Sequence, residues 1–586
     1  MTNIPRSEHP RPDRLRQNWS TLNGPWRFAF DWNRQGKKER WYLQNEYPLE
    51  ICVPFAYESK LSGINRQEHC DVVWYEREIP IPENLCGLRR LLHFGAVDYK
   101  ADVWLDGQYL GFHEGGYTPF SFDITDLTAG KTSCRLTVCC EDRLDFYQAR
   151  GKQSFRPAPF DCWYTPVTGI WQSVWLEGVG AYYPVDFRLT SHIETASVKV
   201  EIELNELPSD GVLRLTAAYQ GQAVACQEIR VMTDRFIQTE LYLSHNERLE
   251  GIHMWQPGNP ALYNLTIETV VGGVVCDSVE TYFGMRKVDV QGDHVLLNQK
   301  SFYQRLILDQ GYWPDGLLTA PSDEALKRDV ELTLQMGYNG ARKHQKFEDP
   351  RYLYWADHLG LVVWSELPSA YWLCSREKRN LIRDLSEAIR RDFNHPCIIT
   401  WATINESWGV PFIRYQKEAQ ALADLLYHMV HCLDGTRLVS GNDGWEMAAT
   451  DLVAIHDYTS WPQDLDEAYQ DPEKIRKSAA AGKHLVTAAG YDHTGKPMLL
   501  SEYGGIAMQK DAGGENWGYN ESEKDEESFL LRFASMTKAI QHMPGFQGYC
   551  YTQLTDVFQE VNGLLDMNRV PKVSLDAVRR INLEKR

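Results

Sequence analysis

Two apolar segments of the chain each end on a glutamate, and these glutamates are the residues best placed to do chemistry. Residues 398–404 precede Asn405 and Glu406, and residues 497–501 precede Glu502. A short apolar run rich in β-branched residues is typical of a strand that is buried on both faces, as in a parallel sheet. In α/β barrels, which are built on a parallel sheet, the reactive side chains stand at the carboxyl ends of the strands. We therefore expect Glu406 and Glu502 to face one cleft.

The spacing of the two glutamates fits alternating strands and helices. They are 96 residues apart, which leaves room for about three βα units of roughly 30 residues each. A pair of carboxyl groups about 5 Å apart is what a retaining glycosidase needs, one as acid/base and one as nucleophile. A single glutamate at a strand end is more often only solvated or ion-paired. The prediction of a catalytic role therefore depends on the presence of both glutamates.

The elements that would position these glutamates begin near residue 286. From there, apolar strands alternate with helical patterns in close to eight βα repeats, which predicts a (β/α)8 barrel over residues 286–586. We expect helices at 325–336, 352–359, 412–433 and 528–541, and strands at 361–364, 437–440, 451–456 and 548–552.

Two β-rich regions precede the barrel. Residues 1–180 alternate short strands with turn signals, including an Asp106-Gly107 hairpin turn, and this predicts an all-β domain. Residues 181–285 alternate in the same way and fit an immunoglobulin-like β-sandwich. No low-complexity linker separates the three regions, so we expect them to pack rigidly.

Composition and charge narrow the range of partners and functions that we expect for this chain. The formal net charge of −19 argues against nucleic acid or an anionic membrane surface as the partner. The 19 Trp and 30 Tyr residues suit the flat faces of sugars. No secretory signal or membrane span is recognised, and 13 cysteines without C-x-x-C spacing predict reduced thiols in a cytoplasmic enzyme. Assembly into a homo-oligomer stays open.

Several motifs together resemble glycoside hydrolase family 2, which holds β-galactosidases, β-glucuronidases and β-mannosidases. They are Asn394-His395-Pro396, Asn405-Glu406, Ser501-Glu502-Tyr503-Gly504 and Gly169-Ile170-Trp171. The resemblance implies a jelly-roll sugar-binding-like domain at 1–180, an immunoglobulin-like β-sandwich at 181–285 and a catalytic TIM barrel at 286–586. It also implies a retaining exo-β-glycosidase that works on a carbohydrate substrate through a covalent glycosyl-enzyme, without a cofactor.

The same resemblance assigns roles to residues. Glu406 would be the acid/base and Glu502 the nucleophile, while Asn405 would hydrogen-bond the sugar 2-hydroxyl. A phenol that donates to the nucleophile would keep it ionised, and Tyr458 is our candidate. The expected substrate-binding set is Asn405, Tyr458, His344, Arg342, Glu366, Trp372 and Tyr551. Loops 369–379 and 504–520 could close the cleft and favour exo action.

Two departures from the family pattern concern the presence of a metal site and the choice of sugar. Ala370 and Trp372 lie where the large β-galactosidases place magnesium ligands, and neither side chain coordinates a hard cation, so we expect no metal site. The Asn-x-Lys motif with which β-glucuronidases bind the sugar carboxylate is absent from residues 551–564. A neutral sugar, and hence β-galactosidase-type activity, is the main expectation.

Three alternatives stay open. A β-glucuronidase would need a fixed cation, for which Arg342 or Lys343 could serve. An arabinosidase of the same family is the second alternative. The third belongs to another class, a non-catalytic carbohydrate-binding protein, and the presence of both Glu406 and Glu502 argues against it.

Overall fold

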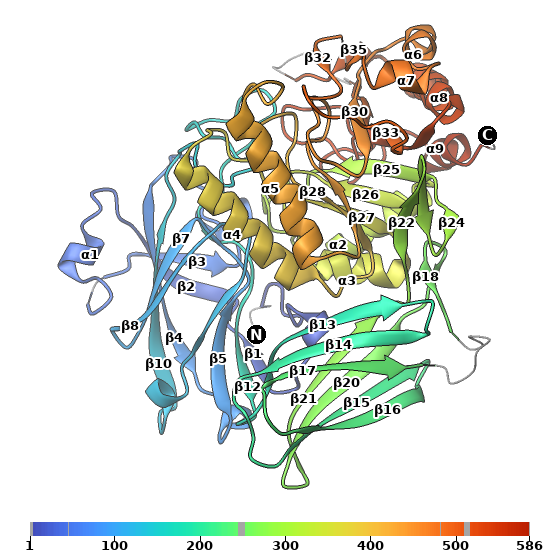
Figure 1. Cartoon of the computed structure of the whole chain (residues 1–586). Helices are drawn as coiled ribbons and strands as arrows, with labels where there is room; N and C mark the ends of the chain where they lie inside the picture. The colour runs from blue at the N-terminus through green and yellow to red at the C-terminus, as the bar shows by residue number, and fades with distance from the viewer. Residues whose placement is uncertain (1–3, 45, 244–251, 481, 509–515, 585–586) are drawn as a thin grey trace.

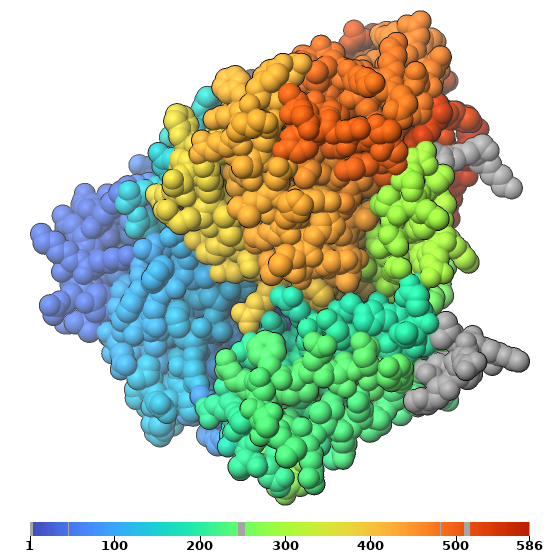
Figure 2. Space-filling view, in the orientation of Figure 1, coloured from blue at the N-terminus to red at the C-terminus, as the bar shows by residue number. Residues whose placement is uncertain are grey.

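The structure, a computed structural model, describes residues 4–44, 46–243, 252–480, 482–508 and 516–584. The chain forms two β-sandwiches and a barrel (Figure 1). The first sandwich is blue, the second green, and the barrel runs from yellow-green to red. Both sandwiches pack against the barrel (Figure 2). Arg383 of the barrel donates to the hydroxyl of Tyr99 in the first sandwich at 3.1 Å, and Arg188 of the second sandwich donates to the carbonyl of Leu433 in the barrel at 3.0 Å.

The N-terminal domain is an antiparallel β-sandwich. One sheet has the order β3-β2-β4-β10-β7-β8 and the other β1-β12-β5-β9. These strands are β1 (Trp19–Thr21), β2 (Gly24–Phe30), β3 (Leu49–Val53), β4 (Val72–Pro80), β5 (Arg89–Phe94), β7 (Lys100–Leu105), β8 (Gln108–Glu114), β9 (Phe120–Asp123), β10 (Ser133–Glu141) and β12 (Val174–Val179). The hairpin turn between β7 and β8 is confirmed, since Asp106 and Gly107 have φ of 50° and 80°, as a tight two-residue turn requires.

The second domain is a smaller sandwich with sheets ordered β13-β14-β17 and β16-β15-β20-β21. Its strands are β13 (Pro184–His192), β14 (Ser197–Leu204), β15 (Gly211–Tyr219), β16 (Gln222–Val231), β17 (Phe236–Tyr242), β20 (Tyr263–Val271) and β21 (Val274–Phe283). The strands alternate buried and open residues, as the buried Val198, Val200 and Ile202 of β14 illustrate. Apolar packing between the two sheets holds this domain, because its described cysteines, Cys226 and Cys276, are free thiols.

The third domain is a parallel barrel with strands ordered β29-β28-β27-β26-β25-β36-β33-β30. The strands are β25 (Gln304–Asp309), β26 (Gly340–Lys343), β27 (Val362–Glu366), β28 (Ile398–Ala402), β29 (Leu438–Ser440), β30 (Val453–His456), β33 (Met498–Gly504) and β36 (Phe546–Thr552). Single bridges, such as that between Gly444 and Ile455, close the gap between β29 and β30, the first and last strands of this order. All residues of β28 and β33 are buried, which confirms that both glutamate-bearing segments are barrel strands covered on both faces.

The barrel helices are α2 (Asp323–Gln335), α3 (Pro350–Leu359), α4 (Ser375–Asp392), α5 (Lys417–Leu433), α6 (Pro462–Ala468), α7 (Pro472–Ile475), α8 (Glu526–His542) and α9 (Leu575–Asn582). The predicted start of a helix at 412 is wrong, because Phe412 has a φ of 57° and α5 begins only at Lys417. Residues 375–379, expected in a loop, form the first turn of α4. Residues 509–515 of the other expected loop lie outside the described residues. No described helix is long and apolar enough to cross a membrane.

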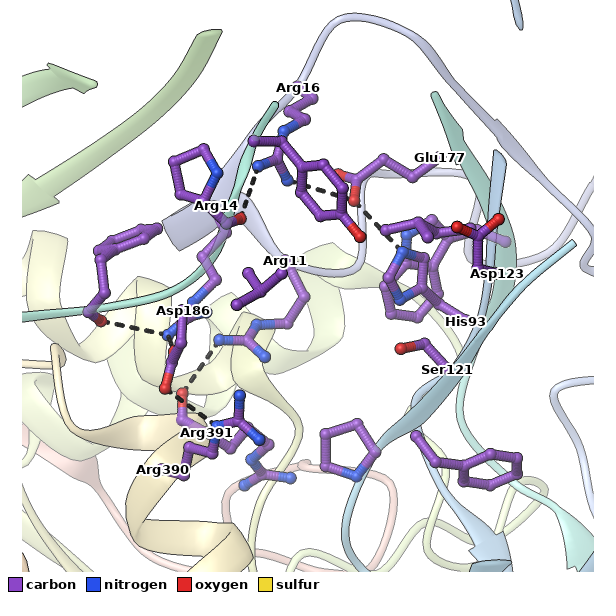
Figure 3. Close-up of a pocket in the computed structure, with 18 of the residues that line it drawn as sticks. Arg11, Arg14, Arg16, His93, Ser121, Asp123, Glu177, Asp186, Arg390 and Arg391 are labelled. Carbon is purple, nitrogen blue, oxygen red and sulfur yellow. Dashed lines mark hydrogen bonds and ion pairs between the residues drawn. The ribbon is translucent and has the colours of Figure 1, made fainter. Parts of the chain in front are cut away.

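The segment around Arg11 and Arg16 ties the three domains together (Figure 3). Arg16 Nη1 lies 3.3 Å from Glu177 Oε2 of β12, and Arg16 Nε lies 3.1 Å from Asp277 Oδ2 of β21. Arg11 donates to the carbonyl of Arg391 on α4 at 3.0 Å. An interdomain pocket of about 430 Å³ is bordered by Arg11, Arg16, Glu177 and Arg391. Burial alone would raise the pKa of Glu177, but Arg16 beside it lowers that pKa to about 2.

Replacing Arg16 by methionine is expected to lower the free energy of unfolding by about 3–5 kcal/mol, because Glu177 and Asp277 would stay buried without their cation. The pKa of Glu177 is depressed in the folded protein, so its contribution is complete above the ordinary value of 4.5 and is lost as the pH falls through about 2. The deficit of the variant should therefore be smaller in acid. Thermal unfolding at two pH values measures it.

Arg390→Met is the matched control. Arg390 pairs with Asp186 at 2.9 Å, but its side chain is 58% exposed, so we expect a loss of only about 0–1 kcal/mol. Equal destabilisation by the two variants would contradict the role given to Arg16.

Candidate active site

Glu406 and Glu502 meet at the C-terminal end of the barrel strands. Glu406 follows β28 by four residues, and Glu502 lies within β33. A carboxylate oxygen of each glutamate and a ring nitrogen of His456 all lie within 4.8 Å of one another. This separation fits the retaining arrangement, about 5–5.5 Å between carboxyl groups, and is too short for the inverting one, about 6.5–9.5 Å.

The backbone at Glu406 is held in an uncommon conformation. Glu406 and Ser407 have φ of 51° and 60°, in the left-handed region that side chains other than glycine seldom adopt. The Glu406 amide donates to the carbonyl of Asp443 at 2.8 Å, and the Ser407 amide donates to Asn442 Oδ1 at 3.0 Å. Such backbone strain persists only where the surrounding structure fixes it, and it is found most often at functional sites.

Arg342 of β26 organises the floor of the site. Its buried guanidinium donates to Glu502 Oε1 at 2.8 Å, to Asn405 Oδ1 at 2.8 Å and to Glu366 Oε2 at 3.0 Å. Burial would lower the pKa of Arg342, but the carboxylates, with Asp443 foremost, raise it well above its usual value. Arg342 is therefore a fixed cation that donates its hydrogen bonds to acceptors within the protein.

His456 stands between the two glutamates. Its Nδ1 lies 2.8 Å from Glu406 Oε1 and its Nε2 lies 2.7 Å from Asp443 Oδ1. Burial would lower the pKa of His456, but Glu502, Asp443 and Glu406 raise it to about 10, so the ring is an imidazolium. Burial alone would raise the pKa of Glu406, yet the hydrogen bond from His456 lowers it. The proton of this pair rests on His456, one hydrogen bond away from Glu406.

Glu502 is held at both oxygens. Arg342 occupies Oε1, and the hydroxyl of Tyr458 donates to Oε2. The ring of Tyr458 stacks on Tyr519, with centroids 3.9 Å apart and planes 8° apart. The structure thus brings Tyr458 to the partner that the sequence predicted for it.

Glu366 and His344 form a second polar group beside Arg342. His344 Nδ1 lies 3.1 Å from Glu366 Oε2, and Gln345 Nε2 donates to Glu366 Oε1 at 2.7 Å. Burial raises the pKa of Glu366 to about 6, against the influence of Arg342. Burial, together with the nearby charge of Lys152, lowers the pKa of His344 well below its usual value. A neutral His344 whose Nδ1 faces Glu366 has Nε2 left to meet a sugar hydroxyl.

Family models match almost the whole chain. The sugar binding domain of glycosyl hydrolases family 2 matches residues 19–177, the domain described as glycosyl hydrolases family 2 matches 183–286, and the family's TIM barrel domain matches 288–582, which is half of the chain. The chain belongs to glycosyl hydrolases family 2. It is therefore a glycoside hydrolase that works with retention of configuration.

Relatives of this family 2 hydrolase carry several activities in their names. A β-glucuronidase from Paenibacillus borealis is 23% identical over 97% of each chain. A β-galactosidase from Thermoanaerobacter pseudethanolicus is 26% identical over 75% of this chain and 58% of its own. Among solved structures, a β-galacturonidase from Eisenbergiella tayi bound to galacturonate has a TM-score of 0.76 at 20% identity and covers 100% of both chains. That structural likeness shows the shared fold.

Two residues predicted to bind substrate in this family 2 hydrolase lie elsewhere. Tyr551 packs against Phe533 of α8, with ring centroids 5.0 Å apart, because alternate residues of β36 face opposite sides and Cys550 takes the inner one, near Arg342. The structure thus places Tyr551 in the core and does not bring it to the glutamates. Trp372 is 57% exposed and contacts Phe146 of the N-terminal domain, so it lies outside the group around the glutamates.

Sequence reasoning missed a residue that the N-terminal domain contributes. Lys152 lies in the long segment between β10 and β11 (Gly169–Ile170), where the amides of Arg150 and Gly151 each donate to the carbonyl of Ser369 at 3.0 Å. The buried Lys152 Nζ lies 4.8 Å from the ring centroid of Trp408, two residues after Glu406. Lys152 is 254 residues from Glu406 in the chain, so no local pattern connects them.

Lys152 is a charged group without a carboxylate partner. Within the part of the chain that the structure describes, no Asp or Glu forms an ion pair with it. Burial would lower the pKa of Lys152, but Cys162, Glu560 and Glu406 raise it, so the ammonium stays charged. Glu560, also missed, accepts hydrogen bonds from Tyr164 at 2.5 Å and from Asn562 at 3.0 Å.

The group of possible metal ligands at the site is Glu406, His456 and Glu502. His456 Nδ1 already faces Glu406 and its Nε2 faces Asp443, while both oxygens of Glu502 accept from Arg342 and Tyr458. A cation would have to displace the proton of His456. A metal at this position would therefore oppose acid/base chemistry rather than supply it.

Proposed function

We propose that this family 2 hydrolase is an exo-β-glycosidase that removes a terminal β-linked hexuronic acid, of glucuronic or galacturonic configuration. Glu502 is the nucleophile and Glu406 the acid/base in this proposal. The choice of an acidic sugar rests on one observation, the charged and buried Lys152 without a carboxylate partner among the described residues.

The two carboxylates differ in the way that their roles require. Arg342 and Tyr458 hold both oxygens of Glu502, which orients it for attack on the anomeric carbon. Among the described residues, His456 engages one oxygen of Glu406, and the Glu406 side chain is 20% exposed, so it can reach a glycosidic oxygen. Asn405 accepts from Arg342 and keeps its amide NH₂ for the sugar 2-hydroxyl. This division of roles does not support the alternative of a binding protein without activity.

Lys152 is placed to meet a carboxylate on the sugar. Its Nζ lies 4.8 Å from the ring centroid of Trp408, two residues after Glu406. Its charge also lowers the pKa of Glu406 and of His344, and it acts against the raised pKa of Glu560. A buried ammonium without a carboxylate partner is costly. The described residues supply no such partner to Lys152, and a substrate carboxylate would supply a charge-assisted hydrogen bond.

The cations that the sequence suggested for this task are already used. Arg342 donates to the protein acceptors described above. Lys343 pairs with Asp309 at 2.5 Å and with Glu348 at 2.8 Å. Lys152 could therefore replace the missing Asn-x-Lys lysine, and the expected preference for a neutral sugar is not confirmed. The β-glucuronidase and β-galacturonidase named among the relatives support the acidic alternative.

A Lys152→Met variant is expected to lose uronidase activity selectively. The kcat/KM for 4-nitrophenyl β-D-glucuronide or galacturonide should fall by about 30- to 1000-fold, the cost of removing one partner of a buried charge pair. The matching β-glucoside and β-galactoside differ only at C6 and should change by less than about 3-fold, because they do not carry that charge. An α-L-arabinopyranoside completes the panel.

Two controls sharpen this test. Lys152→Arg keeps the charge and should retain more uronidase activity than Lys152→Met, whereas Lys131→Met removes an exposed lysine paired with Asp106 and should change nothing. Wild-type enzyme that prefers the galactoside or the arabinoside to both uronides would overturn the proposal. An equal loss on charged and neutral sugars in Lys152→Met would do the same.

A further inference from the structure

His456 is buried between the two glutamates proposed to do the chemistry. Its side chain is 1% exposed, so it can act on a substrate only through another residue. Its Nδ1 lies 2.8 Å from Glu406 Oε1, and its Nε2 lies 2.7 Å from Asp443 Oδ1 and 3.4 Å from Glu502 Oε1. Carboxylates from three different parts of the barrel therefore surround one imidazole ring.

The ring of His456 is held in place. A Cβ atom at Gly444 would lie 2.9 Å from His456 Nδ1, so the ring packs directly against the Gly444 backbone, whose φ of 110° favours glycine. The ring of Trp445 contacts the imidazole edge-on, with centroids 5.9 Å apart. Asp443 accepts from Nε2 at the other end of the ring. Nδ1 therefore stays aimed at Glu406.

The titratable and charged groups around His456 come from several barrel strands and the turns after them: Arg342, His344, Glu366, Glu406, Asp443 and Glu502. Arg342 Nη1 lies 3.3 Å from His456 Nε2 and opposes a positive charge on the ring. Burial lowers the pKa of His456, but the Glu502 carboxylate, followed by Asp443 and Glu406, raises it to about 10. The ring therefore keeps its proton at neutral pH while Glu502 is ionised.

The charge of Glu502 disappears during the reaction. A retaining glycosidase converts its nucleophile into a neutral ester and regenerates the carboxylate by hydrolysis. A buried imidazolium that loses a neighbouring carboxylate loses part of what offset its burial, so its pKa falls. His456 should therefore bind its proton tightly before Glu502 attacks and less tightly afterwards. The leaving group needs a proton at the point where this affinity drops.

We infer that His456 is a positioning residue that stores the proton used in catalysis. It holds the proton while Glu502 is a carboxylate, passes it to Glu406 for delivery to the glycosidic oxygen, and takes it back through Glu406 from the attacking water. This inference rests on the proposed function only through the roles of Glu406 and Glu502, and it does not depend on the sugar.

The proton and the electron pairs balance over one turnover. In the first step the proton moves from His456 Nδ1 to Glu406, and a half-turn of the carboxyl group presents it to the glycosidic oxygen. The bond from C1 to that oxygen breaks with its electron pair on the oxygen, which takes the proton, while Glu502 forms a bond to C1. In the second step water gives a proton to Glu406 and on to His456, its oxygen bonds to C1, and Glu502 leaves as a carboxylate.

The variant that tests this inference is His456→Asn. The asparagine amide can replace Nδ1 as a donor to Glu406 but cannot release a proton, so Glu406 must hold the acid proton itself. For a methyl glycoside, kcat/KM at pH 8 is expected to fall by about 10- to 100-fold, a part of the usual contribution of general acid catalysis, and to approach the wild-type value in acid. A nitrophenyl glycoside leaves without a proton and should change by less than about 3-fold at either pH.

The matched control is His428→Asn, which removes an exposed histidine on α5 and should leave both pH profiles unchanged. An equal loss on both glycosides at every pH would mean that His456 is only structural, and an unchanged methyl glycoside profile would equally overturn the inference. The sugar is whichever one the enzyme cleaves, so failure of the uronide proposal is seen separately. Failure of the role given to Glu406 is seen in Glu406→Ala.

A second measurement uses the wild-type enzyme and does not depend on the folding of a variant. A 2-deoxy-2-fluoro glycoside of the cleaved sugar traps the glycosyl-enzyme, because the fluorine slows its hydrolysis. With ¹⁵N-labelled histidine, NMR at pH 8 should show His456 as an imidazolium in the free enzyme and as a neutral imidazole in the trapped enzyme. An imidazolium in both states would contradict the storage and release of the proton by His456.

Discussion

Replacing Glu502 by alanine is expected to reduce hydrolysis of every substrate by roughly 10⁴- to 10⁶-fold, the scale of losing a covalent nucleophile. The space left would still face the Arg342 guanidinium and the Tyr458 hydroxyl, which now bind the two oxygens of Glu502. Both groups donate hydrogen bonds, so they should accept a small anion such as azide or formate. That anion would attack the anomeric carbon and give a product of opposite anomeric configuration, which NMR detects.

The control for this variant is Glu467→Ala, which removes an exposed glutamate on α6 and should leave the rate unchanged. Arg342 keeps Glu366 and Asn405 as partners in Glu502→Ala, so the fold should survive, and circular dichroism checks this. Substantial turnover by Glu502→Ala without added anion would show that another group is the nucleophile.

Replacing Glu406 by alanine is expected to separate substrates by their leaving groups. Attack by Glu502 does not need Glu406, so a nitrophenyl glycoside, which leaves without a proton, should still form the glycosyl-enzyme. A methyl or sugar aglycone needs the proton and should lose about 10²- to 10⁴-fold in kcat/KM, the usual contribution of general acid catalysis. Azide should then speed the breakdown of the intermediate, with retention of configuration.

Stopped-flow measurement of the nitrophenol burst follows the first step of this reaction, and steady-state rates follow the second. The deciding result is the difference between good and poor leaving groups. Equal losses on both would mean that Glu406 does not donate the proton, and that the roles drawn from its position after β28 are wrong.

The alternation of strands and helices, and the residues at two strand ends, could be predicted because they depend on local patterns. The buried run before Glu406 and the run before Glu502 each form a barrel strand, and barrel geometry then brings their ends together. The face on which Tyr551 lies could not be predicted, because a shift of one residue along a strand changes the face of a side chain, and the residues of β36 are buried on both faces.

Contacts between domains could not be predicted. Lys152 reaches the barrel only because the segment between β10 and β11 leaves its own sandwich and pairs with Ser369. The role of Arg342 was incomplete for a similar reason, since four barrel strands or the turns after them supply its partners Glu366, Asn405, Asp443 and Glu502. Such convergence is a property of the closed barrel, and no window of the sequence contains it.

The position of Lys152 has a consequence for how this enzyme can change. The residues proposed to cut the bond belong to the barrel, whereas the residue proposed to recognise the sugar's charge belongs to the first sandwich. Mutations in the segment between β10 and β11 can therefore alter which glycoside is accepted while Glu406 and Glu502 keep their partners. In this proposal, recognition of the sugar and cleavage of the glycosidic bond depend on different domains. Exchange of the first sandwich would therefore be a route to new substrates.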